Sequence, residues 1–112
     1  MSVLEDLTEL LSEFAPIETG VFSDDAPEEY MILTPLADTF DLYSDNRPDY
    51  DTQQARISIY SKNNYRQLKN KVTNALVYGD FVIGERRYIG REDDTGYFHY
   101  AIDVAKLYPV EV

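Results

Sequence analysis

The feature that most constrains the fold of this chain is a change of hydrophobic period between residues 55 and 77. Ile57 and Ile59 alternate with polar neighbours, as in a strand that buries one face. From residue 65 onward, apolar side chains instead recur at the spacing of an amphipathic helix: Tyr65, Leu68, Val72, Ala75 and Leu76. Small polar residues at 61–64 can cap this helix. The stretch therefore predicts a strand that leads directly into a helix.

Another amphipathic helix is predicted near the N-terminus. Apolar side chains repeat at helical spacing from Val3 to Phe14, with Ser2 as the expected N-cap and Glu5 as its capping-box partner. Pro16 is expected to end the helix, because proline cannot continue the helical hydrogen bonding.

The other periodic segments predict three more strands: residues 30–36 with the alternation resumed at 39–43, residues 81–91, and residues 97–106. Pro35 is expected at an edge or a bulge, and the acidic segment 92–96 at a hairpin turn. Gly79, just after the second helix, is expected to adopt the left-handed conformation of a C-cap. Residues 44–54 contain almost no aliphatic side chains, so we expect a long, mobile connection there.

Together these segments predict a single α+β domain over residues 1–112, with the element order α-β-β-α-β-β. Two helices should pack on one face of a mainly antiparallel four-stranded sheet. The chain has no cysteine, which excludes a disulfide framework and a thiolate metal site. No apolar run approaches the roughly 20 residues that span a bilayer, so we expect a soluble, unexported chain without a membrane partner.

Charge is segregated along the chain, whose net charge is −11. Residues 1–51 contain 14 acids and one base, whereas residues 52–91 contain eight bases and two acids. An acidic and a basic part within one small domain suit head-to-tail packing of copies, or docking between two partners. If folding interleaves the two parts, the segregation disappears, and the sequence leaves both outcomes open.

Signatures of catalysis and of ligand binding are weak. His99 is the only histidine, and neither a serine elbow motif nor a second histidine ligand accompanies it, which favours a structural role. Paired acids such as Asp93 and Asp94 lack calcium-loop spacing, and the glycines do not form a phosphate loop. We therefore predict a protein that is not an enzyme and that holds no cofactor or metal.

Two groups of residues remain as a candidate interface with a partner or another copy. The bases of the second helix and of the strand after it form one group: Lys62, Arg66, Lys69, Lys71, Arg86 and Arg87. Their expected complement is the acids of the first helix or of the segment before the first strand: Asp24, Asp25, Glu28 and Glu29. Tyr50 is included because tyrosine offers a large contact area with a polar tip. The alternative readings are a solvated helix face and the general preference of strands for tyrosine.

The second half of the chain resembles the tail terminator proteins of long-tailed bacteriophages and prophages, also called tail completion or tail-to-head joining proteins. The resemblance rests on two runs, ISIYSKNNYRQLKNKV and RRYIGREDDTGYFHYAID. In them a strand leads into a helix, and an arginine-aromatic strand, an acidic turn and an aromatic final strand follow. The first half matches in element order and length only.

The resemblance implies a non-enzymatic α+β subunit that forms a ring, commonly a hexamer, on the finished tail tube. Such a ring contacts the tail-tube protein and later a head-completion or connector protein, at the head–tail interface of the virion. The subunit is made in the cytoplasm of the bacterial host. DNA would only pass through the channel, and a net negative subunit suits this passage because fixed acids repel phosphate.

Two other functions stay open at this point. An acidic protein can imitate DNA and so inhibit a basic partner such as a nuclease or a repressor, although the eight bases of residues 52–91 count against this. A small enzyme could instead use His99 together with nearby acids.

Overall fold

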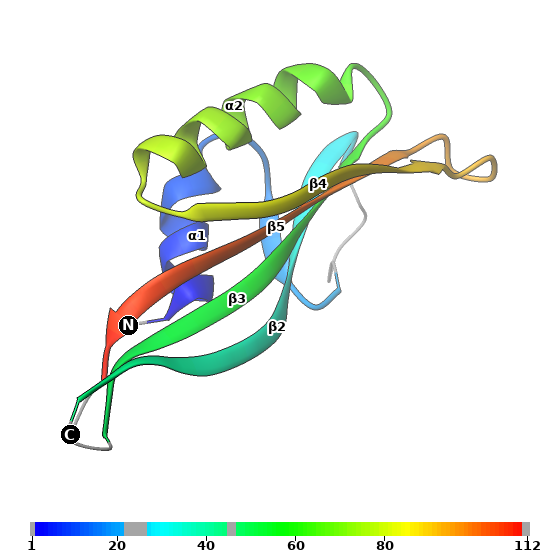
Figure 1. Ribbon diagram of the computed structural model, residues 1–112. Helices are drawn as coiled ribbons and strands as arrows, with labels where there is room; N and C mark the ends of the chain where they lie inside the picture. The colour runs from blue at the N-terminus through cyan, green and yellow to red at the C-terminus, as the bar shows by residue number, and fades with distance from the viewer. Residues whose placement is uncertain (1, 22–26, 45–46, 111–112) are drawn as a thin grey trace.

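The structure is a computed structural model that describes residues 2–21, 27–44 and 47–110. Within these ranges the chain forms two helices and five strands (Figure 1). In chain order they are α1 (Val3–Leu11), β1 (Ile17–Thr19), β2 (Glu29–Ser44), β3 (Arg47–Ser61), α2 (Tyr65–Tyr78), β4 (Val82–Arg91) and β5 (Phe98–Pro109).

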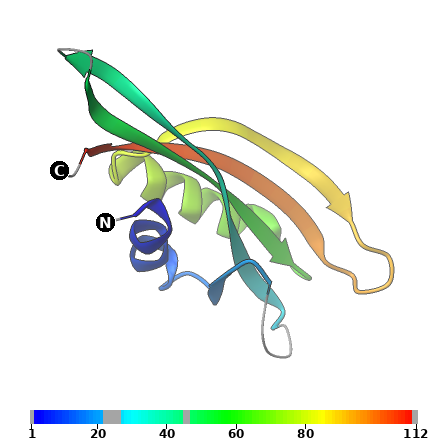
Figure 2. The same ribbon diagram turned by 90° about the horizontal axis from the view of Figure 1, so that it is seen from below.

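The strands form one sheet in the order β1-β2-β3-β5-β4. β1 pairs with β2 in parallel, and the other three pairings are antiparallel. Both helices cover the same face of the sheet, as the two views in Figures 1 and 2 show. α1 packs beside β1 and β3, whereas α2 packs over β3, β5 and β4. The opposite face carries no helix in the described part of the chain.

Two helices and a sheet are present as predicted, but the predicted sheet and element order are wrong. The sheet is mixed and has five strands rather than four, and the described order is α-β-β-β-α-β-β. The strand that the sequence did not reveal is β1, which pairs with residues 31–33 of β2. Its three residues are too few to show the alternation by which a strand is recognised.

The prediction of a long connection at residues 44–54 is also wrong over most of its length. Residues 47–54 belong to β3, which pairs with β2 and, from Tyr50 onward, with β5. Residues 45–46 of the predicted connection lie outside the described part. This end of the sheet projects past α1 (Figure 1), and residues 34–40 of the neighbouring β2 are all exposed. Backbone hydrogen bonds to two neighbouring strands can hold a strand that has few aliphatic side chains. A polar sequence therefore does not exclude a strand here.

The cap predicted for α1 is confirmed, whereas the predicted end is three residues late. The Ser2 hydroxyl accepts a hydrogen bond from the backbone N–H of Glu5 at 3.2 Å and donates one to the Glu5 carboxylate at 3.2 Å. The helix ends at Leu11, and a turn follows before Pro16.

The end of α2 differs from the prediction in the role of its glycine. Gly79 has a φ of −90°, and the left-handed conformation belongs to Asp80, with a φ of 65°. Glycine is instead favoured by a close approach: a Cβ at position 79 would lie 3.0 Å from the carbonyl oxygen of Ala75 and 3.1 Å from Leu10 Cδ2. The absence of a side chain therefore lets the end of α2 pack tightly against α1.

Two local predictions are confirmed. The pairing of β2 with β3 shifts register between Pro35 and Asp38, which is the bulge expected at the proline. Residues 92–96 form the turn between β4 and β5, closed by a hydrogen bond of 2.8 Å from Glu92 N–H to the Tyr97 carbonyl, with Gly96 at a φ of +79°.

The core lies between the helices and the sheet. β3 contributes the alternating residues expected from the sequence, all fully buried: Ala55, Ile57 and Ile59. The same face of β5 contributes Tyr100, Ile102 and Val104. The helices contribute one stripe each: Val3, Leu7 and Leu11 from α1, and Leu68, Val72 and Leu76 from α2.

Replacing Leu7 tests whether α1 belongs to this core. Because its side chain is fully buried, we expect Leu7→Ala to lower the free energy of unfolding by about 2–5 kcal/mol, measured by urea denaturation. The exposed Glu9 on the same helix provides a matched control, and Glu9→Ala should change stability by less than about 0.5 kcal/mol. Equal effects of the two substitutions would show that α1 is not docked on the sheet.

Candidate assembly interface

The order of the strands separates the two charge classes of the sequence in space. β1 and β2 lie at one edge of the sheet, with α1 packed on β1 and β3, and β4 lies at the other edge, with α2 packed on β3, β5 and β4; the two helices contact each other. Residues 2–21 and 27–44 contain nine acids and no base, whereas residues 65–91 contain six bases and two acids. We call α1, β1 and β2 the acidic side, and α2 and β4 the basic side.

Three of the predicted interface bases lie on α2. Arg66 and Lys71 are exposed, and Lys69 is half-buried with its ammonium 5.2 Å from the centre of the Tyr100 ring. None of the three forms an ion pair with a residue that the structure describes. α2 therefore presents cationic groups that carboxylates of another molecule can neutralise.

Two further predicted bases lie on β4, the outermost strand of the basic side. Arg86 and Arg87 are exposed, and they point to opposite faces because they are adjacent in a strand. Arg87 lies 3.2 Å from the Glu85 carboxylate, and the two side chains are 54% and 62% exposed. Pairs exposed to this degree contribute little to stability, so a stronger partner can replace Glu85.

Lys62, by contrast, lies beside acids of its own chain. Its ammonium is 4.9 Å from the centre of the Tyr97 ring, and its backbone N–H donates a 2.9 Å hydrogen bond to the Glu28 carbonyl. The Glu29 carboxylate accepts a 2.9 Å hydrogen bond from the Ser61 hydroxyl. The structure therefore brings together one predicted base and two predicted acids within one copy, and folding removes the segregation at this point. Two predicted acids lie outside the described residues: Asp24 and Asp25.

Two other bases are neutralised within the chain. Arg56 on β3 binds Asp103 on β5 through two hydrogen bonds of 2.7 and 3.1 Å, and this carboxylate raises the pKa of the guanidinium. The Lys106 ammonium lies 3.6 Å from the Asp6 carboxylate. Charges thus mix across the middle of the sheet. The bases of α2 form no ion pair with a described residue, whereas on β4 Arg87 and Arg91 form exposed pairs, with Glu85 and with Asp93 at 3.6 Å.

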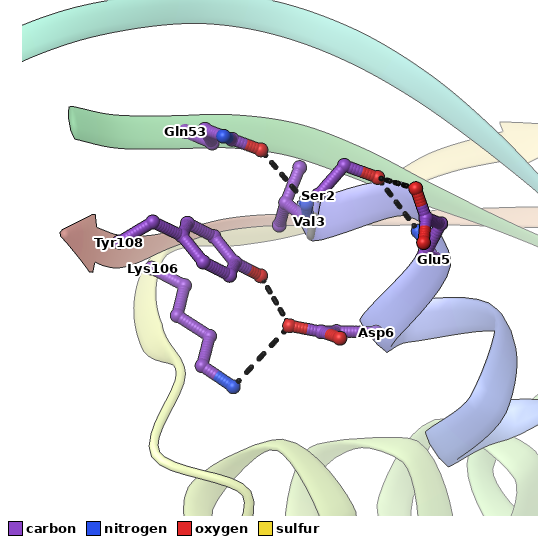
Figure 3. A network of polar contacts seen from close by, with 7 residues as sticks. All are labelled: Ser2, Val3, Glu5, Asp6, Gln53, Lys106 and Tyr108. Carbon is purple, nitrogen blue, oxygen red and sulfur yellow. Dashed lines mark hydrogen bonds and ion pairs between the residues drawn. The ribbon is translucent and has the colours of Figure 1, made fainter. Parts of the chain in front are cut away.

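A polar network fixes α1 to the sheet and so sets which acids face outward (Figure 3). The backbone N–H of Val3 donates a 2.8 Å hydrogen bond to the Gln53 side chain, and the Tyr108 hydroxyl donates one of 2.5 Å to Asp6. Burial, together with the Asp6 carboxylate, raises the pKa of Tyr108 and keeps this hydroxyl a donor. With Asp6 turned toward β5, exposed acids remain elsewhere on this segment: Glu5, Glu9 and Glu13.

Both sides also expose apolar side chains. On the basic side these are Val77, Tyr78, Val82, Tyr88 and Ile89, and on the acidic side Leu36 and Phe40. Phe40 is 55% exposed and Tyr78 is 88% exposed. Apolar and aromatic side chains next to charged ones are typical of interface surfaces. These exposed apolar residues could not be recognised from the sequence, because apolar residues in helices and strands are equally expected on the faces that point into the core.

The tyrosines divide into packed and exposed ones. Tyr65 of α2 stacks on Tyr88 and Tyr100, with ring centres 5.6 and 5.9 Å apart, so these rings help to hold α2 on the sheet, and Tyr88 also remains 47% exposed. Tyr50, the tyrosine predicted to lie at an interface, is 37% exposed on the projecting part of β3. Its position leaves it free to contact a partner, although it lies in a strand and not in a loop.

His99 lies on the sheet face that the helices leave uncovered. Its ring stacks on Tyr60 with the centres 4.3 Å apart, and Tyr30 stacks on the other side of Tyr60 at 4.8 Å. His99 Nε2 is buried and has no hydrogen-bond partner among the described residues. Burial lowers the pKa of His99. The environment is that of a packed aromatic side chain.

Other kinds of site find little support. Among the described residues, no group of three or more metal-ligating side chains is placed to hold an ion. No helix in the same ranges is long and apolar enough to cross a membrane. An open pocket of about 280 Å³ is lined by Asp6, Glu9, Leu10, Gly79, Phe81 and Lys106. Its lysine is already bound by Asp6 and lies 4.8 Å from the Phe81 ring centre.

Comparison with known proteins gives no assignment, since no protein-family model and no curated protein matches this sequence. The candidate site therefore rests on the geometry described above, in which one sheet separates an acidic side from a basic side.

The buried histidine generates a pH prediction. Because the pKa of His99 is lowered in the folded chain, the unfolded chain binds the proton more readily. The free energy of unfolding should therefore be highest above pH about 6.5 and should fall as the pH drops through this value. His99→Phe keeps a ring against Tyr60 but cannot titrate, so its unfolding free energy should be flatter between pH about 5.5 and 7. Urea denaturation at several pH values measures both, and identical profiles would contradict the assignment.

Proposed function

We propose that this chain is a non-enzymatic structural subunit that assembles head to tail into a ring. The observation that carries this proposal is that the acidic strands β1 and β2 and the basic strand β4 lie at opposite edges of one sheet. Like sides of two copies repel each other, whereas the basic side of one copy attracts the acidic side of the next. A contact between two different surfaces generates a ring when the rotation between copies closes.

The ring is proposed to be the tail terminator of a long-tailed bacteriophage or prophage, located at the head–tail interface of the virion. This role is supported by the resemblance of residues 57–72 and 86–103 to such proteins and by an α+β subunit with unpaired bases on its surface. The partners are further copies, commonly six to a ring, the tail-tube protein and a head-completion or connector protein. The net charge of −11 suits a channel in which DNA slides without binding.

The acidic side alone would also fit a protein that imitates DNA. Such a protein acts by binding a basic partner, and the six bases of α2 and β4 would repel that partner. The ring uses both sides, which is why we favour it.

Electron microscopy of particles that lack this protein tests the proposed role. In the phage or prophage that encodes the chain, deletion should give tails of uncontrolled length or tails separated from full heads. Expression of the wild-type chain in trans should restore normal particles. Normal, infectious particles from the deletion strain would contradict the proposal.

A further inference from the structure

Two strand edges lack a partner in the part of the chain that the structure describes. One is the outer edge of β4, which pairs with β5 alone. The other is the outer edge of β2 beyond Leu33, because β1 covers only residues 31–33. Register shifts divide both strands: Arg86 to Tyr88 form the longest stretch of β4 in constant register, and on β2 constant register runs from Asp38 to Ser44.

The charges on these edges favour one pairing over the others. β4 carries three arginines and one acid, Glu85, whereas the part of β2 beyond Leu33 carries Asp38 and Asp41 and no base. Two β4 edges would bring arginines together, and two β2 edges would bring carboxylates together, so each like pairing is disfavoured. A β4 edge next to a β2 edge places opposite charges side by side. Exposed apolar groups accompany both edges, with Tyr88 at 47% and Phe40 at 55%.

We propose that β4 of one copy pairs with the projecting part of β2 of the next copy, so that the sheet continues from subunit to subunit. This inference rests on the proposed ring and specifies the contact that builds it.

The sheet topology fixes the direction of this pairing. β2, β3, β5 and β4 alternate in direction, so β4 runs opposite to β2. Copies related by rotation about a ring axis keep their strand directions, and β4 therefore meets β2 of the next copy in antiparallel orientation.

The faces of the strands fix which side chains meet. Arg87 is paired with Ala101 and lies on the uncovered face. Asp38 is paired with Gln53, which contacts α1, so Asp38 lies on the helix-covered face. Its neighbour Thr39 therefore lies on the uncovered face, as Arg87 does. Within the β2 run the structure describes the side chains of Asp38, Thr39 and Phe40, and when the middle one of these is set opposite the middle of Arg86 to Tyr88, Arg87 faces Thr39. On the helix-covered face, Arg86 then meets Phe40 and Tyr88 meets Asp38: a cation with an aromatic ring, and a phenol with a carboxylate.

The pairing also offsets successive copies along the strands. Within one copy, the pairings that start at Arg87 lead across the sheet through Ala101 and Ser58 to Ile32 on β2. Thr39 lies seven residues further along β2 than Ile32. At the rise of a strand this offset is roughly 23 Å. A closed ring therefore requires strands inclined to the ring axis, as closure of a barrel does.

Disulfide trapping tests this contact, because the natural chain has no cysteine. Three full-length single-cysteine variants are made at exposed positions: Arg87→Cys, Thr39→Cys and Phe40→Cys. R87C is mixed at low salt with T39C or with F40C and oxidised, and the products are separated on a denaturing gel. Sedimentation velocity of the wild-type chain under the same conditions reports assembly independently, and circular dichroism checks that each variant is folded.

We expect R87C to form a cross-linked dimer with T39C, and only a background amount with F40C, whose side chain lies on the other face. Comparable cross-linking of R87C to T39C and to F40C would overturn the proposed pairing, in which Arg87 and Thr39 share one face of the sheet and Phe40 lies on the other. Assembly of the wild-type chain without R87C–T39C cross-linking would overturn the strand pairing and leave the ring intact. A wild-type chain that stays monomeric and gives no cross-link would overturn both the pairing and the proposed ring.

Discussion

Burial of the apolar face of β3 under two helices is the constraint on which the rest of this structure depends. Ala55, Ile57 and Ile59 are completely buried there, against α1 on one side and α2 on the other. Because β3 and β5 occupy the middle of the sheet, the segment before them must lie at one edge and the segment between them at the other. The first segment is acidic and the second is basic, so the packing of the core also separates the surface charges. Such separation favours association between unlike surfaces and opposes association between like ones, an effect that salt screens.

Most of the regular structure could be predicted from residue periodicity. The helical spacing in α2 and the alternation in β3 and β5 predicted these elements correctly because each of the three buries one face in the same core. β1 could not be predicted, since three residues carry no period and its pairing depends on residues 31–33 of β2. The first half of β3 was missed because its side chains are polar: this half is held by backbone pairing with β2 and β5 and by the hydrogen bond from the Val3 N–H to the Gln53 side chain. Gly79 was assigned the wrong role because its close approach to Leu10 is a tertiary contact.

The candidate interface was predictable only in part. A run of bases in an amphipathic helix implies that the bases face outward, and Arg66 and Lys71 do so. The neighbourhood of Lys62, Glu28 and Glu29 was not predictable, because it follows from the β2–β3 register, which pairs Glu29 with Ser61. The free edges of β2 and β4 were equally hidden, since an edge is a property of strand order and not of local sequence.

Exchanging charges between the two sides tests head-to-tail assembly most directly. One variant carries Arg66→Glu and Lys71→Glu on the basic side, and the other carries Glu9→Lys and Glu13→Lys on the acidic side. Sedimentation velocity at low salt should show that the wild-type chain assembles and that each variant alone remains monomeric. An equimolar mixture of the two variants should assemble again, because the two kinds of subunit can alternate in a ring with an even number of copies. Variants that assemble on their own as the wild type does, or a mixture that stays monomeric, would contradict the account.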